Sequence, residues 1–429
     1  MDRNRPSGVT DINRKNRNEE YTMEIIKGGV TAAKGFRAAS TAAGIKYQGR
    51  TDMAMIYAEN PCKAAGTFTT NVVKAAPVKW DQEIVYHHPA AQVIVCNSGI
   101  ANACTGEEGY GYCRETAKAA AEVLHVPEDS VLVASTGVIG MQLPIEKLAA
   151  GVKQMAPKLD GSLEAGNLAA KAIMTTDTVE KEAAVQVEIG GKTVTVGGMC
   201  KGSGMIHPNM CTMLSFVTTD VNISKELLQE ALSESVKDTY NMVSVDGDTS
   251  TNDTVLLLAG GMAGNPEITE KNEDYEKFCQ ALTYVNTTLA KKIAGDGEGA
   301  TALFEVKIIG AESKEQAVIL SKSVVSSSLT KAAIYGHDAN WGRILCAMGY
   351  SGAKFDPEKV DLYFESRAGK IKIMENGVST GYSEEEATKI LSENEVTAIA
   401  DVKMGDASAT AWGCDLTYDY VKINADYRS

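Results

Sequence analysis

The sequence has few histidines, and its cysteines lack the patterns that bind metals or form disulfide frameworks. Its 429 residues include five histidines and nine cysteines, with no C-x-x-C pair and no H-E-x-x-H segment. We therefore expect no metal site and no bound cofactor. Scattered free thiols are typical of a reducing compartment, so we expect a cytoplasmic protein.

Long hydrophobic runs and an excess of basic residues are also missing. No uninterrupted apolar stretch approaches the roughly 18 residues that a membrane-spanning helix needs. The net charge is −14, whereas proteins that bind nucleic acid usually carry a basic surface. We therefore expect neither a membrane nor a nucleic acid as partner.

The motifs of several common enzyme classes are absent as well. There is no G-x-S-x-G elbow of a serine hydrolase, and the glycines at 295–299 do not fit the dinucleotide pattern G-x-G-x-x-G. Gly191-Lys192-Thr193 lacks the first glycine of a phosphate loop, because that position is Gln186. The acidic segment 244–254 lacks the closing glutamate of a calcium-binding EF-hand.

What is present indicates a large globular protein with mixed secondary structure. Hydrophobic residues make up 44% and charged residues 23%, an ordinary balance, and the length favours more than one domain. Patterns predict strands at 51–57 and 67–73, a hairpin at 184–196 and a helix at 271–294. Such a mixture favours a mixed-sheet α/β or α+β fold. Residues 1–22 are polar and lack a signal peptide's apolar core, so we expect a disordered leader, with an organelle-targeting segment as the alternative.

The stretch 200–220 is the strongest candidate for chemistry. Gly202, Gly204 and Pro208 lead into Thr212, and an apolar run at 213–217 follows, so Thr212 should open a buried strand. A threonine hydroxyl is a poor nucleophile unless a base activates it. If the bond before Thr212 were cut, its free α-amine, with a pKa of about 7.7–8.0, could be that base. An ordinary glycine-rich loop before a strand explains the same residues.

Three other segments allow a structural and a functional reading. Ser135-Thr136-Gly137 follows a short strand and could direct N–H groups towards an oxyanion, or form an ordinary turn. Glu298 lies between two glycines, either in an exposed turn or facing a cavity. The tail 418–429 contains aromatic and β-branched residues, which favours an ordered terminus.

Several segments taken together resemble one family, the ornithine acetyltransferases of arginine biosynthesis. The resemblance runs from residue 23 to 429. It rests on residues 51–54, 97–103, 135–140, 174–178, 201–206, 208–210, 212–214, 336–343 and 427–429. It implies an N-terminal-nucleophile-like core with αββα layers over 23–325 and a smaller C-terminal α/β domain over 326–429, whose tail reaches the active site.

The resemblance also implies an activity. The precursor would cut itself between Cys211 and Thr212 into an α chain, 1–211, and a β chain, 212–429, which assemble as α2β2. Thr212 would then move an acetyl group from N²-acetyl-L-ornithine to L-glutamate. Thr136 and Gly137 would form the oxyanion hole. The implied substrate-binding positions are Thr178, Lys201, Thr212, Glu298, Asn424 and Ser429. Whether acetyl-CoA is a second donor stays open.

Two residues depart from the family pattern, and two other functions remain alternatives. Cys211 stands where alanine is frequent, and Ser429 where threonine is usual. One alternative is an amidohydrolase or aminopeptidase of the same nucleophile type, with water as the acceptor. The other is a non-catalytic binding protein on the same fold.

Overall fold

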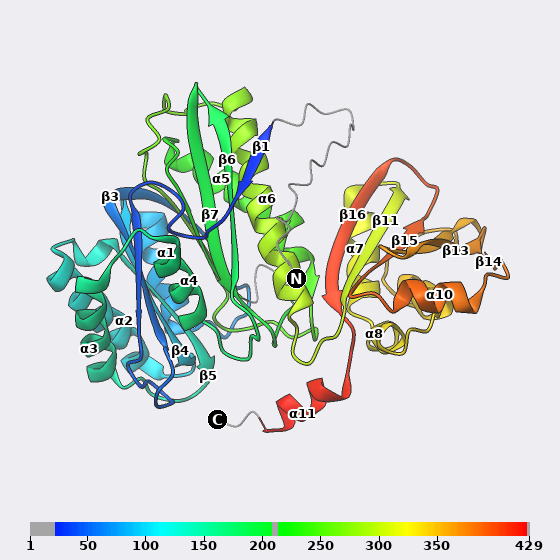
Figure 1. Ribbon diagram of the computed structural model, residues 1–429, viewed down its shortest axis with the longest axis horizontal. Coiled ribbons are helices and arrows are strands. Elements are labelled where there is room, and N and C mark those ends of the chain that lie inside the picture. The colour runs from blue at the N-terminus through cyan, green and yellow to red at the C-terminus, as the bar shows by residue number, and fades with distance from the viewer. Residues whose placement is uncertain (1–21, 208–212, 427–429) are drawn as a thin grey trace, which may run out of the picture.

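The computed structural model describes residues 22–207 and 213–426, which build two mixed sheets (Figure 1). The larger sheet has the strand order β1-β6-β7-β8-β10-β3-β4-β5, and β2 pairs with β3. In it β8 runs parallel to β10 and β4 parallel to β5. Its strands are β1 (Met23–Ile26), β2 (Phe36–Thr41), β3 (Met53–Phe68), β4 (Ala91–Ile100), β5 (Val131–Val138), β6 (Lys181–Ile189), β7 (Lys192–Lys201), β8 (Leu214–Thr219) and β10 (Thr254–Ala259).

The long strand β3 joins the two halves of this sheet. Residues 53–58 pair with β2 and β4, whereas residues 63–68 pair with β10. The register with β4 shifts between Tyr57 and Cys62, and Pro61 lies at that irregularity, where its missing N–H is tolerated. The predicted separate strand at 67–73 is therefore wrong, because residues 67–68 end β3 and residues 69–75 form a loop.

Side chains on β8 and β10 alternate between two hydrophobic cores. Leu214, Phe216 and Leu256 belong to a core shared with β2–β5 and with α1–α4. Val217 and Leu257 point into the other core, which contains α5 and α6. The half-sheets are thus layered between two sets of helices, which confirms the predicted mixed α/β core. These helices are α1 (Ala76–His87), α2 (Gly106–Leu124), α3 (Ile145–Met155), α4 (Leu163–Ala172), α5 (Lys225–Asp238) and α6 (Glu273–Gly295).

The second sheet has the order β14-β13-β12-β15-β11-β16-β9. The predicted domain boundary between residues 325 and 326 stays a prediction. Two strands of this sheet, β9 and β11, come before that boundary in the sequence. Its strands are β9 (Val243–Ser244), β11 (Leu303–Ala311), β12 (Asp361–Ser366), β13 (Gly369–Glu375), β14 (Val378–Ser379), β15 (Glu395–Asp401) and β16 (Ala407–Cys414). The helices that follow β11 are α7 (Lys314–Val325), α8 (Ser328–Tyr335), α9 (Trp341–Gly349), α10 (Glu384–Leu391) and α11 (Tyr418–Asp426).

The chain also contains short 3-10 helices and an ordered segment near its C-terminal end. The 3-10 helices are η1 (Glu128–Ser130), η2 (Ala156–Lys158), η3 (Tyr240–Met242) and η4 (Pro357–Lys359). The predicted order in the tail is confirmed for residues 418–426, which form α11 (Figure 1). In the described part of the chain no single helix has the length and apolar character to cross a membrane, although the bent pair α7–α8 passes on those two criteria together.

Asp81 of α1 has a buried carboxyl group, and one of its two oxygens accepts no hydrogen bond from the described residues. Its side chain is 0% exposed, and Oδ1 accepts a hydrogen bond from the N–H of Val133 at 2.8 Å. Oδ2 has no hydrogen-bond partner among the described residues. Burial raises the pKa of Asp81 well above its usual value, against the smaller opposite effect of the Val133 N–H. Folding therefore favours the protonated acid.

This burial predicts a pH-dependent effect of Asp81→Asn. Because the folded-state pKa is raised, the stability that Asp81 contributes is complete below its unfolded pKa and is lost as pH rises through the folded value. The free energy of unfolding of the variant minus that of the wild type should therefore increase between pH 4 and pH 8. Each unit of raised pKa corresponds to about 1.4 kcal/mol. Urea unfolding at both pH values measures this, and a pH-independent difference would contradict it.

Candidate active site

A cavity of about 110 Å³ lies where β5 and β7 end and β8 begins. Its wall includes Met213, whose carbonyl accepts a hydrogen bond from the N–H of Thr254 at 2.9 Å. Loop 250–253 and α11 close other sides. The cavity brings together five of the predicted site residues, Thr136, Gly137, Lys201, Glu298 and Asn424.

Gly137 adopts a backbone conformation that excludes a side chain. Its φ is +132°, and a Cβ at this position would lie 2.2 Å from the carbonyl carbon of Gly99. The two glycines are partners across the parallel pair of β4 and β5. Because the strands approach so closely, the backbone itself forms the cavity wall at this point. Backbone N–H groups in such a wall are suited to stabilise a developing oxyanion.

Lys201, the last residue of β7, supplies a positive charge to the cavity. The residue is only 8% exposed. Its Nζ donates hydrogen bonds to Oγ1 of Thr175 at 2.8 Å and to Oγ1 of Thr136 at 3.4 Å. These contacts place the ammonium group beside the predicted oxyanion hole, where it can attract a substrate carboxylate.

Asp177 lies behind Lys201 and remains ionised at neutral pH. Burial alone would raise the pKa of Asp177, but the charges of Lys201 and Lys181 and its hydrogen bonds outweigh burial and lower it to about 2. The nearest distance between Lys201 Nζ and the Asp177 carboxylate is 4.0 Å. A fixed negative charge thus lies next to the cation of the cavity.

Glu298 supplies the opposite charge to the same cavity. It is 8% exposed, and its Oε2 accepts a hydrogen bond from Nδ2 of Asn424 on α11 at 2.7 Å. Its backbone N–H donates to the carbonyl of Ser203 at 3.1 Å. The carboxylate packs directly on Gly204, where a Cβ would lie 2.3 Å from Glu298 Cδ. Glu298 therefore faces a cavity and does not lie in an exposed turn.

This contact predicts the effect of Gly204→Ala. The added methyl group would displace the buried carboxylate of Glu298, so binding of an amino-acid substrate should weaken. We expect the KM to rise roughly 10- to 100-fold, since a hydrogen bond to a charged group contributes about 1.5–3 kcal/mol and each 1.4 kcal/mol changes affinity about tenfold. Gly349→Ala is the matched control, because a Cβ at Gly349 meets no atom within 4 Å. Equal KM values for the two variants would refute the role of this contact.

The remaining predicted residues are not all placed at the cavity. Thr178 is exposed and is not in the cavity wall; its backbone N–H donates to Asp296 at 3.1 Å, and its hydroxyl also donates to Asp296. The wall instead contains the neighbouring Thr175 and Thr176. The predicted nucleophile, cleavage position and terminal hydroxyl lie outside the described residues, at Thr212, Cys211 and Ser429.

Asn252 is a cavity residue that the sequence reading missed. Its Nδ2 donates to the carbonyl oxygens of Ala101 at 2.6 Å and Ser135 at 2.8 Å, so it ties together the ends of β4 and β5. In the sequence, the acidic residues of 244–254 resemble a calcium loop more than a cavity wall. The signal that could have identified it is the density of amide and hydroxyl groups directly before an apolar strand.

The described part of the site contains acidic, basic and hydroxyl side chains. Within residues 22–207 and 213–426, no group of three or more His, Cys, Asp or Glu side chains is arranged to hold a metal ion. The wall contains the ammonium group of Lys201 and the carboxyl side chains of Asp253 and Glu298. Together with the backbone at Gly137, such a wall is suited to a zwitterionic amino acid and to a reaction through an oxyanion.

Known proteins are similar to this chain over most of its length. The model described as the ArgJ family matches residues 37–429. The "Arginine biosynthesis bifunctional protein ArgJ 1" of Clostridium acetobutylicum is 52% identical over 412 residues, which cover 95% of this chain and 100% of that protein. The "Arginine biosynthesis bifunctional protein ArgJ" of Thermotoga neapolitana is 52% identical over 397 residues, which cover 92% and 99%.

A solved structure is similar over part of the chain. The crystal structure of the bifunctional protein ArgJ from Bacillus halodurans is 48% identical, with a TM-score of 0.48. The match covers 50% of this chain and 99% of that chain.

Proposed function

The chain belongs to the ArgJ family, and we propose that it is a self-cleaving acetyltransferase of arginine biosynthesis. In this proposal the enzyme moves the acetyl group of N²-acetyl-L-ornithine to L-glutamate through an acetyl-Thr212 intermediate. The observation that carries the proposal is the cavity, which gathers predicted oxyanion and substrate-binding residues from distant segments. Met213 lies in the same wall, directly after the proposed nucleophile.

The proposed enzyme consists of two chains made from one precursor. Cleavage between Cys211 and Thr212 yields the α chain, 1–211, and the β chain, 212–429. These chains stay together because β7 before the cleavage position and β8 after it pair antiparallel in one sheet. We propose that the assembly is α2β2 and lies in the cytoplasm.

The proposed reaction has two half-reactions. The α-amine of Thr212 takes the hydroxyl proton, and the oxygen attacks the acetyl carbonyl carbon of acetylornithine. The Gly137 N–H and Thr136 stabilise the tetrahedral oxyanion, which collapses as the carbon–nitrogen bond breaks and ornithine leaves with the proton. The amine of glutamate then attacks the threonyl ester, which releases N-acetylglutamate and restores the hydroxyl. Lys201 and Glu298 hold the charged groups of the amino acids.

Product analysis distinguishes transfer from hydrolysis. Purified protein is incubated with acetylornithine, with and without glutamate, and ornithine and acetylglutamate are measured. Transfer predicts that acetylglutamate forms in equal amounts with ornithine. Ornithine release that glutamate does not change, without acetylglutamate, would instead support the amidohydrolase alternative. The non-catalytic alternative predicts neither product.

The second donor is tested in the same assay. The word "bifunctional" in the names of the relatives supports a second activity. We propose acetyl-CoA as the additional acetyl donor for glutamate, since the same acetyl-Thr212 intermediate would serve both donors. Acetylglutamate formed from acetyl-CoA and glutamate alone is the expected result. Its absence, with acetylornithine active, would mark a monofunctional enzyme.

A further inference from the structure

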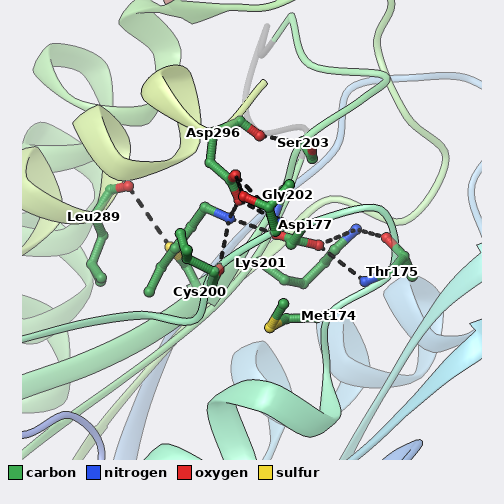
Figure 2. A network of polar contacts seen from close by, with 12 residues as sticks. Met174, Thr175, Asp177, Cys200, Lys201, Gly202, Ser203, Leu289 and Asp296 are labelled. Atoms are coloured by element: carbon green, nitrogen blue, oxygen red, sulfur yellow. Dashed lines mark hydrogen bonds and ion pairs between the residues drawn. The ribbon is translucent and has the colours of Figure 1, made fainter. Parts of the chain in front are cut away.

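A buried cluster of charges lies behind the cavity wall. Figure 2 shows the contacts around Asp177, Lys201 and Asp296, which come from segments far apart in the sequence. Lys181 and Asp177 have fully buried side chains, and the side chain of Asp296 is 9% exposed. Lys181, Asp177 and Asp296 do not line the cavity, although Lys201 does. The cluster contains two cations and two anions, so its charges balance.

Asp177 is the centre of this cluster. One oxygen, Oδ1, accepts hydrogen bonds from Nζ of Lys181 at 2.8 Å and from the N–H of Gly202 at 2.7 Å. The other, Oδ2, accepts from the N–H of Thr175 at 3.0 Å and lies 4.0 Å from Nζ of Lys201. The carboxylate thus holds the chain on both sides of the cavity cation. The carboxylate lies closer to Nζ of Lys181 than to Nζ of Lys201.

Asp296 extends the cluster towards Glu298. It accepts a hydrogen bond from Nζ of Lys181 at 2.5 Å. Its backbone carbonyl accepts from Oγ of Ser203 at 2.7 Å, and the Ser203 carbonyl accepts from the N–H of Glu298 at 3.1 Å. Lys181 therefore links Asp177, which faces Lys201, to the loop that carries Glu298. One cluster therefore supports both Lys201 and Glu298.

We propose that Asp177 and Lys181 are positioning residues that set where the Lys201 ammonium lies. This inference rests on the proposed function, because it explains how that enzyme would bind its substrate. The contact with Lys181, at 2.8 Å, keeps the Asp177 carboxylate 4.0 Å away from Nζ of Lys201. Lys201 thereby stays hydrogen-bonded to Thr175 at 2.8 Å, in the cavity, instead of turning back to Asp177. Buried charges that lose their partner are costly, so either loss should move Lys201.

The two single variants disturb Lys201 in opposite ways. Asp177→Asn removes the anion that Lys181 and Lys201 share, so Lys201 loses its nearest carboxylate while Lys181 keeps Asp296. Lys181→Met leaves Asp177 with Lys201 alone, which should draw the ammonium out of the cavity. Each should raise the KM for acetylornithine roughly 10- to 100-fold, as expected when a bond to a charged substrate group is weakened, while kcat changes only a few-fold. The effect is on substrate binding because neither residue touches the reacting atoms.

The double variant, Asp177→Asn with Lys181→Met, separates charge balance from packing. It removes one anion and one cation, so Lys201 meets neither an excess anion nor a repelling cation. We expect its KM to be lower than that of either single variant. A role in packing alone predicts the reverse, because the double variant loses more contacts. A double-variant KM at or above both single values would therefore overturn the proposal.

The second sheet offers a matched control. Asp361 is also a buried carboxylate, 7% exposed, paired with Lys403 at 2.7 Å and Lys372 at 3.3 Å. Asp361→Asn should lower the free energy of unfolding without changing KM. All variants are compared by urea unfolding, and cleavage is checked by intact mass. If Asp177→Asn does not fold, the comparison of Lys181→Met with the double variant gives the same test.

The outcomes also separate this inference from the proposed function. If the wild type and Asp361→Asn both fail to transfer acetyl groups, the proposed function is wrong. If both are active and the KM values of Asp177→Asn and Lys181→Met stay within threefold of the wild type, the enzyme assignment stands and the positioning role fails.

Discussion

A Thr212→Ala variant is expected to remain a single chain of 45.6 kDa and to transfer no measurable acetyl group. In the proposed mechanism the Thr212 hydroxyl attacks twice, first on its own preceding peptide bond and then on the acetyl donor. Alanine has no hydroxyl, and without cleavage the α-amine that would act as the base stays in a peptide bond. Both activities should therefore fall below detection. Intact mass under denaturing conditions and ornithine release measure them.

Thr212→Ser is the matched control for this prediction. Serine keeps the hydroxyl and, after cleavage, the α-amine, so we expect two fragments and slower but detectable transfer. Measurable transfer by Thr212→Ala would refute the assignment of the nucleophile. A wild-type chain that remains uncleaved at 45.6 kDa would refute self-cleavage itself.

The sequence predicted the local features of this fold better than its long-range contacts. The hairpin around Gly190-Gly191 is confirmed by β6 and β7, and the helix expected at 271–294 is α6. Both depend on periodicity and turn residues within one segment. The strand at 67–73 was wrong because the pattern could not show that β3 continues through Pro61 at a register shift.

In the candidate site, too, the sequence predicted individual residues better than the contacts between distant segments. Motif resemblance identified Lys201 and Glu298, which line one cavity although 97 positions separate them (298 − 201). Lys181 belongs to none of the matching motifs. In addition, a lysine at the start of a strand usually indicates an exposed side chain. Its burial depends on Asp177 and on Asp296, which is distant in the sequence. Charge partners of this kind become visible only when the chain is folded.

Gly137→Ala is expected to lower kcat for acetyl transfer by about 10²- to 10³-fold, the loss that follows removal of one oxyanion donor. A Cβ at this position would lie 2.4 Å from the carbonyl oxygen of Gly99, so β4 and β5 would have to separate. The φ of +132° adds strain for any residue with a side chain. In the proposed mechanism, either adjustment would turn the Gly137 N–H away from the oxyanion, whereas Lys201 and Glu298 would still hold the amino acid. KM should therefore change less than kcat.

Gly140→Ala separates this effect from backbone strain in general. Gly140 also has a positive φ, +86°, and lies three residues further on, but a Cβ there meets no atom within 4 Å. Its cost should appear in the free energy of unfolding and leave kcat within a few-fold of the wild type. If Gly137→Ala and Gly140→Ala have equal kcat, the backbone at Gly137 has no part in stabilising the oxyanion. A selective loss of kcat in Gly137→Ala would show that the close approach of β4 and β5 serves the reaction, because packing alone affects stability.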